Sequence, residues 1–85
     1  MMDYELTEHA KESLQKRANI RLEWLEQAIV SPHRVEQDRI NPSLVHYLFR
    51  VDEFDCRVLR VVLNENVKPP RIITVFFDRS LRGLI

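Results

Sequence analysis

The sequence predicts an α+β domain in which two N-terminal helices pack on a β-sheet. Three segments of the second half are rich in β-branched and aromatic residues and are separated by turn residues or prolines: Ser43–Asp52, Cys56–Asn64 and Arg71–Arg79. Two stretches of the first half carry apolar residues at helical spacing. A chain of 85 residues has room for one hydrophobic core, so we expect a single domain spanning residues 1–85.

The first predicted helix runs from Glu8 to Ala18. Thr7 is a residue type that caps helix N-termini, and Asn19 tolerates the left-handed conformation that often ends a helix. The second predicted helix runs from Arg21 to Val30 and ends at Ser31-Pro32, because the residue before a proline is disfavoured in the α conformation. We expect its core-facing residues to be Leu22, Leu25, Ala28 and Ile29, with Trp24 beside them.

The remaining segments are less distinct. Asp3–Leu6 is either an edge strand or a lead-in, and His33–Ile40 is ambiguous, with a short edge strand as one option. The tight connection Asp52–Asp55 makes Ser43–Asn64 a β-hairpin. Because side chains alternate across a strand, one apolar set per strand should face the helices. These residues are Val45, Tyr47, Phe49, Val51, Leu59, Val61, Leu63, Ile73, Val75 and Phe77.

The charges of the chain balance. Basic and acidic residues both number 13, so the formal net charge is zero, which argues against gripping nucleic acid by bulk electrostatics. Residues 43–85 hold seven basic and five acidic side chains, and every basic one except Lys68 is an arginine. Arginine suits bidentate contacts to phosphate or carboxylate. The commoner meaning of such an imbalance is a solvated surface.

Several features favour a cytoplasmic protein without a cofactor. Cys56 is the only cysteine, which fits a reducing compartment. No apolar run approaches the roughly 18 residues of a membrane span, and the acidic start of the chain does not resemble a secretory signal. The sequence contains no metal-binding spacing, glycine-rich phosphate loop or nucleophile elbow.

The second faces of the predicted strands hold one coherent polar set: His46, Arg50, Arg60, Thr74 and Asp78. Alternation alone favours a solvated surface with arginines lying over exposed apolar residues. The alternative is a shallow basic site, in which arginine binds phosphate and histidine moves protons. Arg79 has the parity of Ile73 and Val75, so it can join Thr74 in one site only if the strand end bends.

Residues 9–79 resemble the small domains known as domain of unknown function family 4258, within the barnase–EndoU–colicin E5–RelE-like group. The residues that carry the resemblance are His9-Ala10, Arg17, Ile20, Ala28-Ile29, Pro32, Arg34-Val35, His46-Tyr47, Leu59-Arg60-Val61-Val62, Ile73-Thr74-Val75 and Arg79. The resemblance implies a RelE-like fold, with two N-terminal helices packed on a curved antiparallel β-sheet of three to four strands.

The resemblance also implies a function, namely metal-independent RNA cleavage by attack of a ribose 2′-hydroxyl on the adjacent phosphate. By position, the catalytic candidates are His9, Arg60 and Thr74, and the phosphate-binding candidates are Arg50, Arg79 and His46. The implied partners are RNA or the ribosome and a cognate antitoxin, as in bacterial toxin–antitoxin pairs. The alternative function is that of a non-catalytic protein-interaction module. Both functions are compatible with a homodimer.

Overall fold

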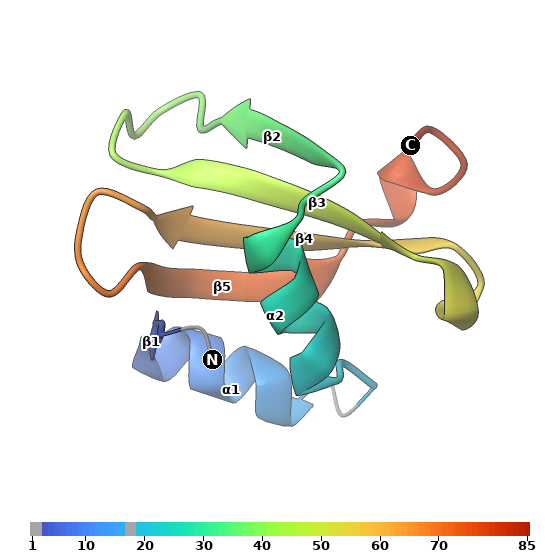
Figure 1. Cartoon of the computed structure of the whole chain (residues 1–85), viewed down its shortest axis with the longest axis horizontal. Helices are drawn as coiled ribbons and strands as arrows, with labels where there is room; N and C mark the ends of the chain where they lie inside the picture. The colour runs from blue at the N-terminus through green and yellow to red at the C-terminus, as the bar shows by residue number, and fades with distance from the viewer. Residues whose placement is uncertain (1–2, 17–18) are drawn as a thin grey trace.

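The computed structural model of the protein describes residues 3–16 and 19–85. Within them, a short strand is followed by two helices and four further strands (Figure 1). The bounds are β1 Glu5–Leu6, α1 Glu8–Lys16, α2 Leu22–Val30, β2 Arg34–Gln37, β3 Val45–Val51, β4 Arg57–Asn64 and β5 Arg71–Phe77, with 3₁₀ turns η1 Asp52–Phe54 and η2 Arg79–Leu81. No helix of this part of the chain has the length and apolar character needed to cross a membrane.

The predicted fold class is wrong in the composition of the sheet. We expected two N-terminal helices on an antiparallel sheet of three to four strands, whereas the described chain begins with a strand and has a five-stranded mixed sheet in the order β1-β5-β4-β3-β2. β1 pairs parallel to β5, and the Glu5 N–H donates to the Pro70 carbonyl at 2.8 Å. The sequence leaves Asp3–Leu6 open between an edge strand and a lead-in, and the structure has an edge strand at Glu5–Leu6. A strand of two residues has no alternation pattern, so the sequence does not decide between the two options.

The prediction that Thr7 begins the first helix is confirmed. The Thr7 hydroxyl accepts a hydrogen bond from the Ala10 N–H at 3.1 Å and donates one to the Ile73 carbonyl at 3.1 Å. One side chain therefore caps α1 and ties it to β5. Ala10 is fully buried. The predicted last turn, with Arg17 and Ala18, lies outside the described residues.

α2 covers the sheet face that carries the apolar sets (Figure 1). Leu25 and Ala28 are fully buried, and Trp24 stacks on Phe54 with 5.4 Å between the ring centroids. The prediction for Leu22 is wrong, because this side chain is 56% exposed. The buried stripe is centred on Trp24, Leu25 and Ala28, and at 100° per residue Leu22 falls at its margin.

The predicted β-hairpin is confirmed, because β3 and β4 pair antiparallel from Val45 opposite Leu63 to Val51 opposite Arg57. In β5, a bulge changes the predicted alternation. Thr74 lies opposite Val62 and Ile72 lies opposite Leu63, so Ile73 is passed over. Ile72 is therefore the residue that is fully buried in the core beneath the helices, and the prediction for Ile73 is wrong.

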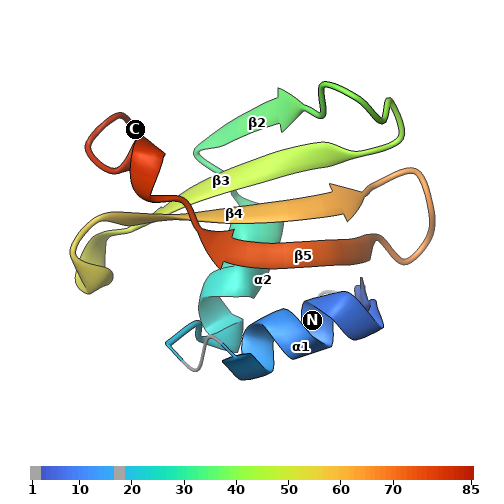
Figure 2. The ribbon, with the colours of Figure 1, turned by 180° about the vertical axis from the view of Figure 1, so that it is seen from behind.

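The sheet face opposite α2 is also largely buried. Leu48, Val58 and Val62 on this face are at most 8% exposed. After β5 the chain turns through η2, which packs against β4, and Figure 2 shows this C-terminal segment crossing the sheet on the side away from α2. The polar residues of this face therefore lie among buried apolar side chains.

Candidate functional site

Arg60 on β4 is the centre of a polar cluster on the face opposite α2. Its Nε and Nη2 atoms both lie 2.9 Å from Oδ2 of Asp78, and its Nη1 lies 2.7 Å from Nδ1 of His46. Glu36 approaches the same Nη1 with Oε1 at 3.6 Å. The Arg60 side chain is only 15% exposed, so these partners hold the guanidinium group in one position.

The imidazole of His46 is hydrogen-bonded through both ring nitrogens. Because a guanidinium group only donates, Nδ1 accepts from Arg60, and the Nε2–H donates to Oδ1 of Asp38 at 2.7 Å. Both ring nitrogens of His46 are therefore occupied by hydrogen-bond partners within the protein.

Asp38 completes the cluster at its other end. Its Oδ2 accepts hydrogen bonds from the backbone N–H groups of Asn41 at 2.8 Å and Ile40 at 3.1 Å. The Asn41 N–H, followed by the His46 side chain and the Ile40 N–H, lowers the pKa of Asp38 to about 2. Asp38 is therefore an ionised acceptor at neutral pH. We call the chain formed by Asp38, His46, Arg60 and Asp78 the Arg60 network.

Asp78 connects the Arg60 network to the C-terminal turn. Its Oδ1 accepts from the Ser80 N–H at 3.0 Å and from the Ser80 hydroxyl at 2.6 Å, while its Oδ2 accepts from Arg60. The hydroxyl of Ser80, and after it Arg60, lowers the pKa of Asp78 against the opposing effect of burial. With both oxygens engaged, Asp78 fixes the start of η2.

A pocket of about 760 Å³ lies where β5 continues into η2. Its lining residues are Asn19, Arg57, Phe77, Asp78, Arg79 and Arg82, and we call it the arginine pocket. The Arg57 guanidinium lies 4.6 Å from the centre of the Phe54 ring, which packs between Trp24 and Phe77. Arg82 forms an ion pair with Asp55. The start of β4, η2 and the residue after η2 thus supply guanidinium groups to one place.

The arginine pocket has an excess of positive charge. Three guanidinium groups line it, of which that of Arg82 is paired with Asp55. The one carboxylate of the lining, that of Asp78, is already bound to Arg60 and Ser80. Arg79 is exposed. Guanidinium groups recognise phosphate and carboxylate oxygens through paired hydrogen bonds. The pocket is therefore suited to bind an anion of the phosphate or carboxylate class.

The structure brings three of the predicted site residues close to one another in the fold. His46 and Arg60 are in direct contact, and Arg79 follows Asp78, the carboxylate to which Arg60 binds. β5 ends at Phe77 and the chain then turns into η2. The chain does turn at the strand end, but Thr74, which the bend was expected to bring together with Arg79, has its hydroxyl 3.4 Å from that of Ser13 on α1.

The other predicted site residues lie apart from this group. The hydroxyl of Thr74 lies 3.4 Å from that of Ser13 on α1, so it is directed toward the helix. His9 is exposed in the first turn of α1, and no hydrogen bond within residues 3–16 and 19–85 joins it to the Arg60 network. Arg50 is bound to Asp52, with 2.5 Å between Nε and Oδ1.

Four residues of this region were not among the sequence-based candidates: Glu36, Asp38, Arg57 and Arg82. Arg57 stands three residues before Arg60, and Arg82 stands three residues after Arg79. Closeness in sequence to a candidate arginine was the one feature that could have pointed to these two residues. Glu36 and Asp38 lie in the segment whose structure was ambiguous, and no local pattern connects them to His46 or Arg60.

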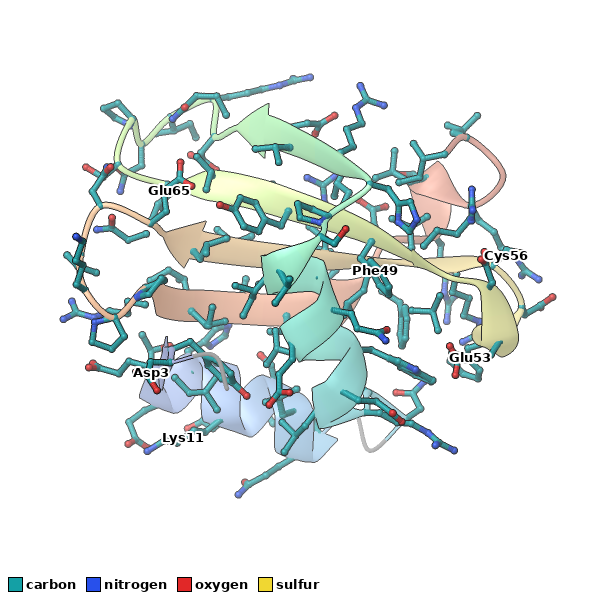
Figure 3. The ribbon with its side chains drawn as sticks, viewed as in Figure 1. Asp3, Lys11, Phe49, Glu53, Cys56 and Glu65 are labelled. Carbon is teal, nitrogen blue, oxygen red and sulfur yellow. The ribbon has the colours of Figure 1, made fainter. Side chains whose placement is uncertain are left out.

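Neither a metal cluster nor the cysteine contributes to this region. In the part of the chain that the structure describes, no group of three or more histidine, cysteine, aspartate or glutamate side chains is placed to hold a metal ion. Cys56 is exposed at the turn between β3 and β4, near Glu53 (Figure 3).

Comparison with known proteins identifies a family. The family model described as "Domain of unknown function (DUF4258)" matches residues 6–77. No curated protein and no solved structure matches the chain. The matched span contains Asp38, His46 and Arg60, whereas Asp78 and the two C-terminal arginines of the pocket follow it.

Proposed function

The chain belongs to the DUF4258 family, and we propose that it is a RelE-like ribonuclease that holds an RNA phosphate in the arginine pocket. The observation that carries the proposal is the convergence of Arg57, Arg79 and Arg82 on one pocket. The carboxylate of Asp78 beside them is engaged by other donors and does not cancel their charge. Local clustering of arginines allows phosphate binding even though the net charge of the chain is zero.

In the proposed reaction, the ribose 2′-hydroxyl loses its proton to water and its oxygen attacks the adjacent phosphorus. The bond to the 5′-oxygen of the next nucleotide breaks, and that oxygen takes a proton from water. A 2′,3′-cyclic phosphate and a free 5′-hydroxyl result. Negative charge builds up on the phosphate oxygens in the transition state, where fixed guanidinium groups stabilise it. Asp78 has a lowered pKa and is therefore a poor proton acceptor, and both ring nitrogens of His46 are already engaged in hydrogen bonds. We therefore assign the acceleration chiefly to charge stabilisation.

The test measures binding and cleavage separately with the intact protein. Binding of a fluorescein-labelled single-stranded RNA is followed by anisotropy, and cleavage is followed on denaturing gels with and without ribosomes. Arg79→Met should weaken RNA binding roughly tenfold, the effect of losing one charge-assisted contact. A 2′-deoxy substitution at the cut site should abolish cleavage, because it removes the nucleophile.

Arg71→Met is the matched control, because Arg71 is also exposed but pairs with Glu5 at the start of β5. This variant should bind RNA like the wild type. Equal losses in Arg79→Met and Arg71→Met would show that binding is nonspecific and would contradict the assignment of the pocket. Tight binding with no cleavage under any of these conditions would contradict the ribonuclease and leave an RNA-binding domain.

A second candidate function is a non-catalytic protein-interaction module, such as one that binds an antitoxin-like partner. The observation that favours it is a hollow of about 540 Å³ beside α2, lined by Glu23, Glu26, Gln27, Val30, Ser31 and Phe49. Figure 3 shows Phe49 beside α2. Its acidic and apolar lining suits a segment with basic and apolar side chains. Inhibition of growth on expression in bacterial cytoplasm, relieved by Arg79→Met, would favour the ribonuclease over this module.

A further inference from the structure

The β2 edge of the sheet carries a surface that the proposed ribonuclease does not use. β2 is the last strand in the sheet order and pairs with β3 on one side. It lies along the upper margin of the sheet in both Figure 1 and Figure 2. Edge strands present backbone N–H and C=O groups that another chain can pair with. The question is which chain fits this edge.

The hydrogen-bond pattern identifies the outward-facing groups of β2. The Asp38 N–H donates to the Leu44 carbonyl at 3.1 Å, and the same register places Glu36 opposite His46 and Arg34 opposite Leu48. In an antiparallel pair, alternate residues bond to the neighbouring strand. Arg34, Glu36 and Asp38 therefore bond toward β3. The N–H and C=O groups of Val35, between them, point away from the sheet.

The side chains of β2 are complementary to a second copy of the same strand. Val35 is 54% exposed, and it is flanked by Arg34 and Glu36, whose charged ends lie 3.0 Å apart on the face opposite α2. In an antiparallel pair of two β2 strands with a two-fold axis through Val35, each Arg34 lies opposite Glu36 of the other copy. Opposite charges directly across a strand pair stabilise it, and like charges destabilise it.

Other positions of the two-fold axis are disfavoured by charge. An axis through Arg34 would place two arginines opposite each other, and an axis through Glu36 would place two glutamates opposite each other. An axis through Gln37 would oppose Glu36 to Asp38. With the axis through Val35, the backbone N–H and C=O groups that point away from the sheet face each other, and each Arg34 lies opposite a Glu36.

We infer that two copies of this chain associate through β2, antiparallel and with a two-fold axis through Val35, so that their sheets become continuous. Each Val35 exchanges its two outward backbone hydrogen bonds with Val35 of the other copy, and their exposed side chains cover one another. The interface is short, so the dimer forms in a concentration-dependent equilibrium. The arginine pocket lies where β5 continues into η2, and β5 is not a neighbour of β2 in the sheet order.

Sedimentation equilibrium of the intact protein tests this inference. The wild-type mass should rise toward twice that of the monomer as the concentration increases. Arg34→Glu should be monomeric, because its dimer would bring four carboxylates together at the interface. Glu36→Arg should be monomeric, because its dimer would bring four guanidinium groups together. An equimolar mixture of the two variants should form the heterodimer, because opposite charges then face each other again.

A second pair of variants covers the case in which Glu36→Arg disturbs the fold through its contact with Arg60. Val35→Pro removes the outward N–H without removing a β2–β3 hydrogen bond and should be monomeric. Val35→Thr retains the N–H and should still dimerise. A wild-type protein that stays monomeric at millimolar concentration would overturn the inference. So would a Val35→Pro variant that dimerises like the wild type.

Discussion

Arg60 illustrates how a charged side chain is accommodated on a largely buried sheet face. Its neighbours across the sheet are Leu48 and Phe76, and the first of these is fully buried. A guanidinium group in such surroundings needs hydrogen-bond acceptors, since an unpaired buried charge is costly. Asp78, His46 and Glu36 supply them. Arg60, a predicted catalytic residue, is therefore occupied by partners within the fold.

We predict that Arg60→Met lowers the free energy of unfolding by about 1–3 kcal/mol, because Asp78 and His46 lose a donor in a partly buried setting. Urea denaturation followed by circular dichroism measures the loss. Arg50→Met is the control, since Arg50 pairs with the exposed carboxylate of Asp52 and should lose less stability. Equal losses in both variants would show that the Arg60 network does not stabilise the fold more than a surface ion pair.

Among the secondary-structure elements, α2 shows most clearly how packing selects one face of a helix. Trp24, Leu25, Ala28 and Ile29 are buried, whereas Leu22 is exposed although it has the same apolar character as Leu25. The aromatic stack of Trp24 on Phe54 holds the helix against the hairpin turn. The helix orientation therefore depends on a contact with a segment distant in the sequence.

We predict that Leu25→Ala lowers the free energy of unfolding by about 2–5 kcal/mol, because the deletion leaves a cavity in the core. Leu22→Ala on the same helix should change it by about 0.5 kcal/mol or less, because the side chain is exposed. Thermal and urea unfolding of the two variants provide the comparison. Comparable losses would mean that Leu22 is buried in the folded protein.

The charges of the complete chain cancel in number but not in position. Basic and acidic residues both number 13, yet three arginines line one pocket. Sequence-wide charge therefore says little about a site whose members come from β4, η2 and the segment after it. A local cluster of this kind makes the affinity for an anion depend on salt, because bound counterions are released.

We predict that the logarithm of the RNA-binding constant falls with the logarithm of the salt concentration with a slope of about −2, as expected for roughly three contacts to a single strand. Arg79→Met should make this slope shallower by about 0.7, because one phosphate contact is removed. Anisotropy titrations between low and moderate salt give both values. A slope near zero would contradict binding through the arginine pocket.

Local sequence patterns identified α1, α2, β3, β4 and β5, since apolar periodicity and capping are properties of neighbouring residues. The same patterns assigned most of the helix-side core. They failed at Ile73, because a bulge is a feature of strand pairing. They left β1 open between an edge strand and a lead-in, because two residues carry no period. Those failures arise where the conformation depends on a partner strand.

For the candidate site too, local patterns predicted some of the contacts, and others depended on the tertiary structure. The sequence indicated that His46 and Arg60 share a face, because alternation along β3 and β4 requires it once the two strands pair as a hairpin. It did not indicate that Asp38 would engage His46 or that Asp78 would engage Arg60. It also did not place Arg57 and Arg82 in one pocket. Those contacts join segments from different parts of the chain, and the tertiary structure alone sets the distances between them.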